Sequence, residues 1–193
     1  NVARGVVREA LKSLEWMRYI DRKPNSGIFL RGPGQASTSI EALVLHSSIG
    51  IPFGAETDLQ CLEVRRLLEV QAIRLACERR RDADITALRA ILAQANAAQG
   101  DGKTLARLDH AFHMQVFEAT QNDILVRVVT PFYLMSEARR QGFFADPANF
   151  RRSQHEHEGL TMAIAAGDAG RAAGLMADHI GRVERYFIDR QPD

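Results

Sequence analysis

Four side chains of the metal-ligand type recur at related positions in the second half of the sequence. Asp109 and His113 stand four residues apart in the run LARLDHAFHMQVFEATQND, and His157 and His179 follow in later amphipathic segments. On a helix, residues four apart share one face with Cβ atoms about 6 Å apart, so Asp109 and His113 can both reach one ion. Carboxylate and imidazole suit zinc, nickel, iron(II) or manganese. The four residues predict a divalent-metal site, with zinc as the first choice.

Each histidine has a simpler interpretation when it is taken alone, because a single histidine on a helix is usually a polar core residue or a surface residue. His157 and His179 both lie beside apolar residues, and burying several imidazoles without partners would be costly. Two further histidines complicate the set. His110 falls on a different face from Asp109 and His113, and His155 lies across the helix from His157. We therefore expect both either to surround the metal ligands without binding the metal or to face solvent.

The elements that must position these residues are helices. From Asp58 onward apolar residues recur with helical spacing almost to the end of the sequence, and strand signals are nearly absent. Short connections favour antiparallel neighbours, so we expect a metal-binding domain over 58–193 that is an antiparallel bundle of six to seven helices. Arg139 and Arg140 are expected at a charged helix end. The predicted helices are 58–81, 83–98, 103–120, 122–142, 148–166 and 168–188.

The N-terminal segment differs from the rest in charge. Residues 1–32 carry seven Lys or Arg against three acidic residues, whereas the remainder carries 18 basic against 21 acidic residues. A basic head on a slightly acidic body indicates that the head contacts a polyanion. Residues 2–16 predict a helix with Arg4 and Arg8 outside its apolar stripe, and β-prone stretches around 24–27 predict a hairpin. Helix and basic hairpin are typical of the second half of a winged helix-turn-helix; a solvated basic helix is the alternative.

Between these parts, residues 33–57 predict a linker in which 40–46 could form a short helix. The composition, 46% hydrophobic and 25% charged, is ordinary for a globular protein, and no apolar run approaches the ~20 residues that a membrane span requires. Cys61 and Cys77 are predicted on one helix roughly 24 Å apart, beyond the reach of a disulfide. We expect both to be reduced, as in a cytoplasm.

Four stretches resemble the GntR family of bacterial transcription regulators. VVREALKSLEWMRYIDRKPNSGIFL is similar to the recognition helix and wing of that family. Three later stretches resemble the FCD ligand-binding domain of that family, the type shared with the fatty-acid regulator branch. They are LEVRRLLEVQAIRLACER, LDHAFHMQVFEATQND and EHEGLTMAIAAGDAGRAAGLMADHI. The resemblance covers most of the chain. It implies that residues 1–32 are a partial winged helix-turn-helix whose first helices precede residue 1.

The resemblance also implies a ligand set and an effector. In metal-binding members one Asp and three His ligate the ion, and the motif places them at Asp109, His113, His157 and His179. The usual effector is a small organic acid whose carboxylate approaches the metal. Arg65 of the EVR motif is the candidate to pair with that carboxylate, because a planar guanidinium can bind it bidentately.

Arg65 and Asn122 also have structural interpretations. Without the family, Arg65 would more simply form a surface salt bridge with Glu69 one turn on. Asn122 opens a helix and is expected to cap it, whereas the resemblance implies that it borders the effector pocket.

Two classes of function remain open. The favoured one is a cytoplasmic transcription regulator, homodimeric because paired heads read paired half-sites, in which metal and effector binding change operator affinity. By resemblance Arg4 and Arg8 contact operator DNA, and Gly27 is the wing-tip glycine. The alternative is a metal-dependent hydrolase or oxygenase on a helical bundle. We expect no enzyme, because the Glu-x-x-His pair of di-iron bundles and the His-Glu-x-x-His motif of zinc proteases do not occur in the sequence.

Overall fold

The computed structural model describes most of the chain, namely residues 2–31, 39–51, 53–98 and 102–188. Residues 33–38 of the predicted linker lie outside the described residues. By its internal contacts the chain divides into two units, Asn1–Pro52 and Phe53–Asp193, and each is described by itself.

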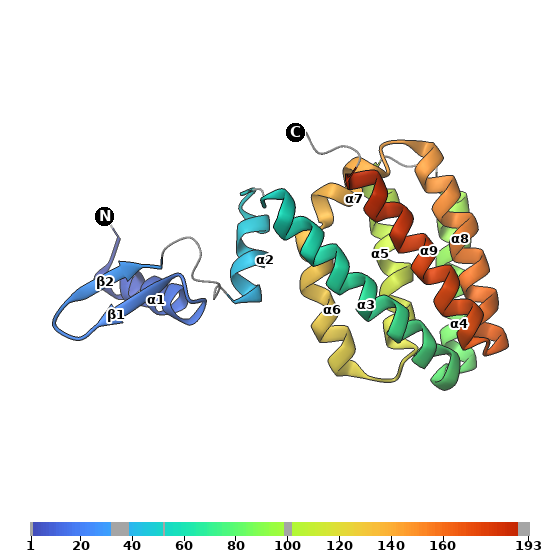
Figure 1. Ribbon diagram of the computed structural model, residues 1–193, viewed down its shortest axis with the longest axis horizontal. Coiled ribbons are helices and arrows are strands. Elements are labelled where there is room, and N and C mark those ends of the chain that lie inside the picture. Colours follow the sequence, from blue (N-terminus) through green and yellow to red (C-terminus); the bar gives the residue numbers. More distant parts are fainter. Residues whose placement is uncertain (1, 32–38, 52, 99–101, 189–193) are drawn as a thin grey trace. The chain divides into compact units, whose positions relative to one another are not determined.

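The N-terminal unit consists of a helix, a hairpin and a second helix (Figure 1). In chain order these are α1 (Arg4–Trp16), β1 (Ile20–Lys23), β2 (Gly27–Leu30) and α2 (Ile40–Ser48). The antiparallel strands end with Lys23 opposite Gly27. Asn25 and Gly27 have φ values of 56° and 120°, which suit asparagine and glycine better than other residues, so the chain turns here as predicted. The Tyr19 hydroxyl donates to the Ala42 carbonyl at 3.1 Å and ties α2 to this unit.

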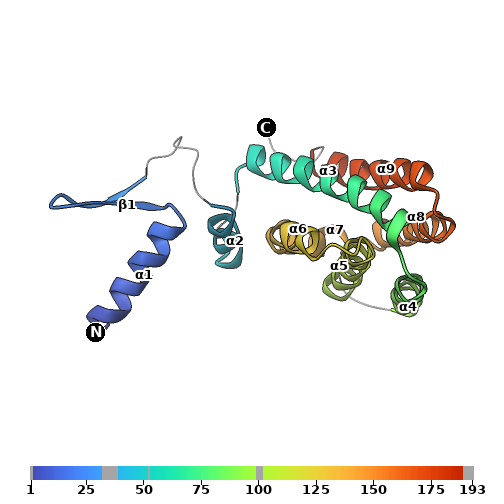
Figure 2. The same cartoon turned by 90° about the horizontal axis from the view of Figure 1, so that it is seen from below.

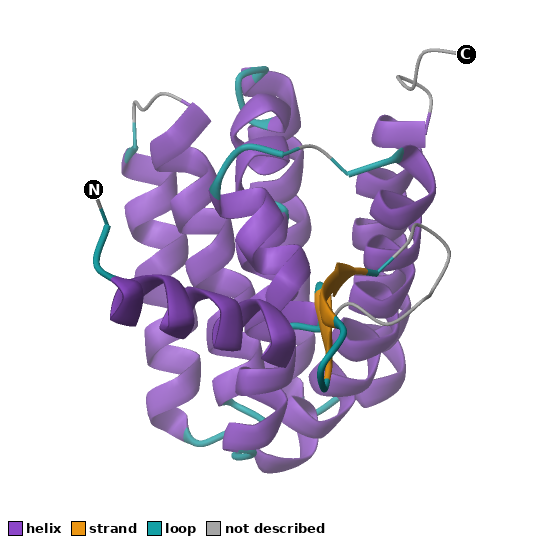
Figure 3. Cartoon of the chain, turned by 90° about the vertical axis from the view of Figure 1, so that its left-hand side faces the viewer, coloured by secondary structure: helices purple, strands orange, loops and turns teal. Residues whose placement is uncertain are grey.

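The C-terminal unit contains seven helices within the described residues, and Figure 3 shows that the strands are confined to the hairpin. The helices are α3 (Ala55–Arg79), α4 (Asp82–Ala97), α5 (Gly102–Glu118), α6 (Asp123–Met135), α7 (Glu137–Phe143), α8 (Pro147–Ala166) and α9 (Ala169–Ile188). α3 packs along α9, and α5 packs against α3, α4, α6 and α7. Figure 2 shows α3 and α9 in one layer and α5 and α6 in another. The predicted class, a mostly α chain with a helix-and-hairpin head and a bundle of six to seven helices, is confirmed.

The predicted helix 122–142 is wrong as a single element, because the chain forms two helices there. The break is at Ser136, whose φ of −95° and ψ of 4° lie outside the α-helical region. Pro131 has no N–H to donate, so α6 already lacks one hydrogen bond before the break. Arg140 Nη1 donates to the Tyr133 carbonyl and to the Ser136 hydroxyl, each at 3.1 Å, and satisfies acceptors that the break frees.

Local sequence explains the ends of α8. The Asp146 carboxylate caps the helix by accepting from the Ala148 N–H at 2.8 Å, and Pro147 occupies the first position, where its missing N–H costs nothing. Gly167 ends the helix with a φ of 73°. α8 and α9 therefore match their predicted bounds within one residue, whereas α3 begins at Ala55, before its predicted start at 58.

Apolar side chains from five helices fill the middle of the C-terminal unit. The large members of this cluster are Ile73, Leu88, Leu92, Phe112, Val116, Leu160, Ile164, Met176 and Ile180. Removing this apolar surface from water, at about 25 cal/mol per Å², is the main term that holds the helices together. One ring of the predicted metal site joins the cluster directly, since His157 stacks on Phe112 with ring centroids 3.9 Å apart.

Within the described residues, none of the helices has both the length and the apolar character needed to cross a membrane. Cys61 and Cys77 are both free thiols on α3.

Candidate metal centre

Three helices bring the four predicted metal ligands together. Asp109 and His113 come from α5, His157 from α8 and His179 from α9. One ligand atom from each lies within 4.8 Å of those of the others, and all four side chains are buried. Residues separated by as many as 70 positions therefore form one compact cluster, which we call the Asp-His cluster.

The distances inside the Asp-His cluster suit a single ion. Nε2 of His179 lies 3.3 Å from Nε2 of His113 and 3.3 Å from Nε2 of His157. The Asp109 Oδ1 atom lies 3.7 Å and 3.6 Å from the Nε2 atoms of His113 and His157. Two ligand atoms bound at ~2.1 Å lie about 3.0 Å apart at 90° and about 3.4 Å apart at the tetrahedral angle. The Nε2 atoms of His113 and His157 already lie at this spacing from Nε2 of His179, and the Asp109 oxygen lies a few tenths of an ångström beyond it from those of His113 and His157.

Carboxylates behind two of the histidines orient the rings. Glu69 Oε2 lies 3.1 Å from His113 Nδ1, and Glu156 Oε2 lies 2.7 Å from His179 Nδ1. An ionised carboxylate only accepts hydrogen bonds, so in neutral imidazoles the hydrogen is on Nδ1 and the Nε2 lone pair is free. Two such lone pairs face each other across 3.3 Å, which favours a cation between them. His157 Nδ1 is buried and has no hydrogen-bond partner among the described residues.

The charges around the cluster also favour a cation. Burial opposes ionisation of Glu69, but His113 and Arg65 outweigh it and lower its pKa to about 2. Burial likewise disfavours a charged His113, yet Glu69 and Asp109 outweigh burial and raise the pKa of this imidazole. The same carboxylates favour any cation on His113, whether a proton or a metal ion. Burial and the neighbouring histidines hold the pKa of His157 well below its usual value, so this ring is neutral, as a ligand must be.

Glu156 is itself fixed by an arginine on α9. Arg182 donates from Nε to Oε1 at 2.9 Å and from Nη2 to Oε2 at 2.7 Å, and its Nη2 also reaches the Ser153 hydroxyl at 2.8 Å. Burial would raise the pKa of Glu156, but His179 and Arg182 lower it to about 2. Glu69 was expected only as the salt-bridge partner of Arg65, from its i, i+4 spacing, and no sequence signal pointed to Glu156 or Arg182.

Arg65 forms the ion pair with Glu69 that its spacing suggests, but this pair is buried and does not lie on the surface. Its Nε lies 3.2 Å from Glu69 Oε1, and its Nη2 donates to the Tyr133 hydroxyl at 2.8 Å. The guanidinium also lies over the Tyr133 ring, 4.4 Å from the centroid, while the Tyr133 hydroxyl donates to Glu69. Arg65 is therefore connected to His113 of the Asp-His cluster through one shared carboxylate.

Arg140, which was expected at a charged helix end, lies in the last turn of α7 with its side chain buried. Its side chain is only 6% exposed, it lies over the Tyr133 ring with its guanidinium 5.0 Å from the centroid, and its Nε is buried without a partner among the described residues. Arg139 pairs with Asp58 at 2.5 Å. The physical reason is the break at Ser136, which turns the Arg140 side chain inward to the free acceptors of α6.

Arg140 lines a small cavity of about 130 Å³ between α5, α6 and α7. Most of its charged side chains are basic, and the polar lining residues are Lys103, Arg107, His110, Tyr133, Glu137, Arg140 and Gln141. His110 is half-buried here and stacks on Tyr133 with centroids 4.9 Å apart. Burial and Arg140 lower the pKa of His110 to about 4. We call this space the basic cavity; Tyr133 connects it to Glu69 and so to the Asp-His cluster.

The other predicted site residues lie outside the cluster. Asn122 caps α6, since its Oδ1 accepts from the N–H groups of Ile124 at 3.1 Å and Leu125 at 3.4 Å. It is not among the lining residues of the basic cavity. Arg4, Arg8 and Gly27 belong to the N-terminal unit, where all three are exposed.

Comparisons with known proteins agree on one class. Residues 60–182 match the FCD domain family. The chain is 32% identical to the HTH-type transcriptional regulator LutR of Bacillus subtilis over 190 residues. The matched region covers 95% of this chain and 84% of LutR. The chain is 28% identical over 180 residues to the Nta operon transcriptional regulator of Aminobacter aminovorans, with 93% and 75% covered.

The fold has relatives among solved structures. A GntR protein of Streptococcus agalactiae superposes with a TM-score of 0.57 over 95% of this chain and 82% of that one, at 22% identity. At this identity the likeness concerns the fold alone.

Proposed function

Because the chain belongs to the GntR family of transcription regulators and carries the FCD domain of that family, we propose that its helical unit binds a divalent metal ion and a small carboxylate effector that together modulate operator binding. The observation that carries the proposal is the buried Asp-His cluster, in which three imidazole nitrogens converge and two of the rings are held by carboxylates. Chance placement of surface histidines would not orient them in this way.

Asp109, His113, His157 and His179 would hold the ion, and zinc suits this donor set best, with nickel, manganese or iron as alternatives. When bound, the ion would supply a Lewis-acidic centre that attracts a carboxylate oxygen. Glu69 and Glu156 keep the Nε2 lone pairs of their histidines directed at it.

The effector proposal is supported by buried cations near the cluster. Arg65 and Arg140 both lie over the Tyr133 ring, and Arg140 keeps an unused Nε donor beside the basic cavity. A small acid would gain charge-assisted hydrogen bonds from such groups. We add Arg140 to the predicted effector residues Arg65 and Asn122. The volume of about 130 Å³ favours a compact acid of a few carbon atoms.

For the N-terminal unit we propose contact with operator DNA through Arg4 and Arg8 on α1 and through the wing at Gly27. The φ of 120° at Gly27 favours a residue without a Cβ, which suits close approach to a sugar-phosphate backbone. We further propose a cytoplasmic homodimer, whose two heads read two half-sites. Effector binding would change operator affinity by a coupling of about 1–3 kcal/mol, or roughly 5- to 150-fold.

The direct test of the metal is elemental analysis of the purified full-length protein. We expect about one ion per chain, and background levels in the double variant Asp109→Ala, His157→Ala, since structural ions need their full ligand set. The control His155→Ala removes an exposed histidine from the same helix as His157 and should retain the ion. Equal metal content in all three proteins would remove the ion from the proposal.

The regulator is tested by gel-shift titration of DNA from its own promoter region with and without small organic acids. We expect a specific shift and an altered affinity with one of the acids. Turnover of an acid without DNA binding would favour the metal-dependent enzyme instead. The named relatives are transcriptional regulators, and we propose no reaction for this chain.

A further inference from the structure

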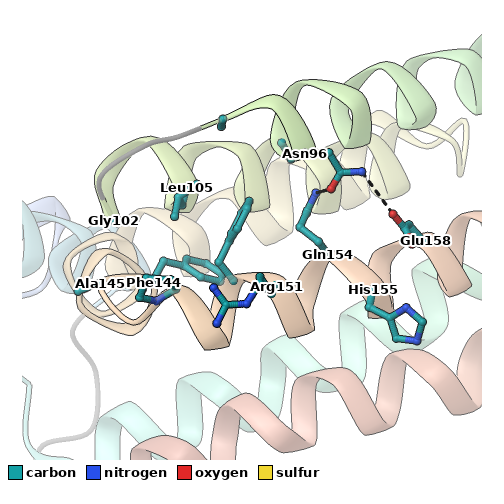
Figure 4. A pocket seen from close by; sticks show the side chains of 13 residues that line it. Asn96, Gly102, Leu105, Phe144, Ala145, Arg151, Gln154, His155 and Glu158 are labelled. Carbon is teal, nitrogen blue, oxygen red and sulfur yellow. Dashed lines mark hydrogen bonds between the residues drawn. The ribbon is translucent and has the colours of Figure 1, made fainter.

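A second cavity is lined in part by α8 and has no residue of the Asp-His cluster in its lining. It measures about 530 Å³ and is formed where α4 ends, α5 begins and the α7–α8 corner turns (Figure 4). From α8 it is lined by Pro147, Phe150, Arg151, Gln154, His155 and Glu158. None of its lining residues is a predicted metal ligand or lines the basic cavity. We call it the outer cavity.

One end of the outer cavity is apolar. Leu105, Phe144 and Phe150 supply large side chains there, while Ala95 and Ala98 are small enough to leave the space open. All three large residues are less than 10% exposed and belong to a continuous apolar cluster, so the wall is firmly packed. An apolar ring or chain placed against it would leave water without having to create the cavity.

Polar groups occupy the middle and the far end. Figure 4 shows Arg151 between the apolar end and a chain of amide and carboxylate groups. In this chain Gln154 Nε2 donates to Asn96 Oδ1 at 3.4 Å, and Asn96 Nδ2 donates to Glu158 Oε1 at 3.3 Å. Arg151 has no acidic partner within the part of the chain that the structure describes, although its neighbour Arg152 pairs with Glu156. Arg151 is thus a cation beside the apolar wall with no ion pair among the described residues, whereas the Glu158 carboxylate of the far end accepts a hydrogen bond from Asn96.

We propose that the outer cavity is a second ligand site, which binds an amphipathic organic anion independently of the metal. The apolar body of the ligand would lie against Phe144 and Phe150, and its carboxylate would face Arg151 and the amide of Gln154. The volume lies within the usual 300–1,000 Å³ range of small-molecule sites. It is also several times that of the basic cavity, so the two sites select acids of different size.

The probe for this site is 8-anilinonaphthalene-1-sulfonate, a fluorescent aromatic anion, titrated into the full-length protein in the presence of EDTA. We expect saturable binding that 3-phenylpropionate displaces and the cation 2-phenylethylamine does not. Arg151→Gln should weaken the probe about three- to tenfold, as loss of a solvent-accessible ion pair does. Arg89→Gln, which removes an exposed arginine of α4 that does not line the cavity, should bind as the wild type does.

A second variant keeps the test independent of charge. Ala98→Phe, at a partly exposed position just beyond α4, would fill the apolar end and should abolish probe binding while the circular-dichroism melting curve stays unchanged. Wild-type affinity in both Arg151→Gln and Ala98→Phe would overturn the proposal, as would equal displacement by the amine. Because EDTA is present throughout, neither result depends on the metal proposal.

Discussion

At the scale of single residues, Glu69 lies between the Asp-His cluster and Arg65 and contacts both. It has no exposed surface, and it receives hydrogen bonds from Arg65, Tyr133 and His113. A buried carboxylate is costly unless charges and donors surround it, and here they do. Glu69 therefore links a proposed metal ligand to the arginine that is proposed to meet the effector.

Replacing Glu69 should affect both folding and metal binding. In Glu69→Ala, Arg65 stays buried without its counter-charge, so we expect the free energy of unfolding to fall by about 3–5 kcal/mol. His113 also loses the carboxylate that orients it, which should weaken metal binding roughly 10- to 100-fold. Urea denaturation and competitive metal titration measure the two effects. Glu63→Ala, at an exposed position on the same helix, should change neither; a Glu69→Ala protein as stable as this control would refute the account.

The residues of the site differ in how far the sequence could predict them. The spacing of Asp109 and His113 is local, so periodicity alone places both on one helical face. The carboxylate partners are not local. Glu156 directly precedes His157 in sequence, yet it pairs with His179 on the next helix, because the packing of α8 against α9 decides which imidazole it meets.

At the scale of elements, hydrophobic periodicity predicted most helices but missed the break between α6 and α7. The residues on both sides of Ser136 continue an acceptable helical pattern, so no local signal marks the position. The break is stabilised by a tertiary arrangement in which the Arg140 side chain is buried against Tyr133. Sequence patterns do not show where such a side chain points, and for this reason the burial of Arg140 was not predicted.

Arg80 lies where the C-terminal ends of α3 and α8 meet, and its contacts predict how a substitution at Gly167 changes stability. Arg80 donates to the carbonyls of Cys77 and of Ala165, and a Cβ added at Gly167 would lie 3.0–3.4 Å from its guanidinium. Gly167 also has a φ of 73°, so Gly167→Ala should lower the free energy of unfolding by about 1–2 kcal/mol.

Gly159→Ala is the matched control on the same helix. Its added Cβ would make only an ordinary contact, 3.8 Å from the Leu175 side chain, so we expect a stabilisation of up to about 1 kcal/mol from the better helix former. Urea denaturation of both variants gives the comparison, and a shift in the same direction for both would contradict the assigned role of Gly167.

At the scale of the whole molecule, the proposed homodimer predicts that a charge introduced on one exposed apolar surface of the C-terminal unit would prevent dimerisation. Leu67 on α3 and Ile124 on α6 are each 63% exposed, and these helices pack against each other. Leu67→Glu should therefore halve the mass seen by sedimentation equilibrium, because a buried, unpaired charge in an interface is costly. Met162→Glu, at a 60% exposed position on α8, should leave the mass unchanged. A dimer that tolerates Leu67→Glu would exclude this face.

Operator binding by the full-length protein tests the head. Arg8→Ala should weaken the complex by about 1–3 kcal/mol if the side chain reads a base, or should lower the slope of log affinity against log salt by about 1 if it contacts a phosphate. Gel-shift titrations at several salt concentrations separate these cases. Arg89→Ala, an exposed arginine of α4, should leave both affinity and slope unchanged; the same behaviour in Arg8→Ala would remove α1 from the interface.

The burial of the Asp-His cluster would make exchange of a bound metal ion slow. The four side chains are 5% exposed or less and come from three different helices, so an ion held there could exchange only when the helices part. Such openings are rare events whose frequency follows local stability and not the concentration of ions outside. The metal would thus be acquired once, near the time of folding, and would outlast many cycles of effector binding. Metal occupancy of such a regulator would respond slowly to the metal supply, whereas its effector occupancy would respond quickly to the concentration of the acid.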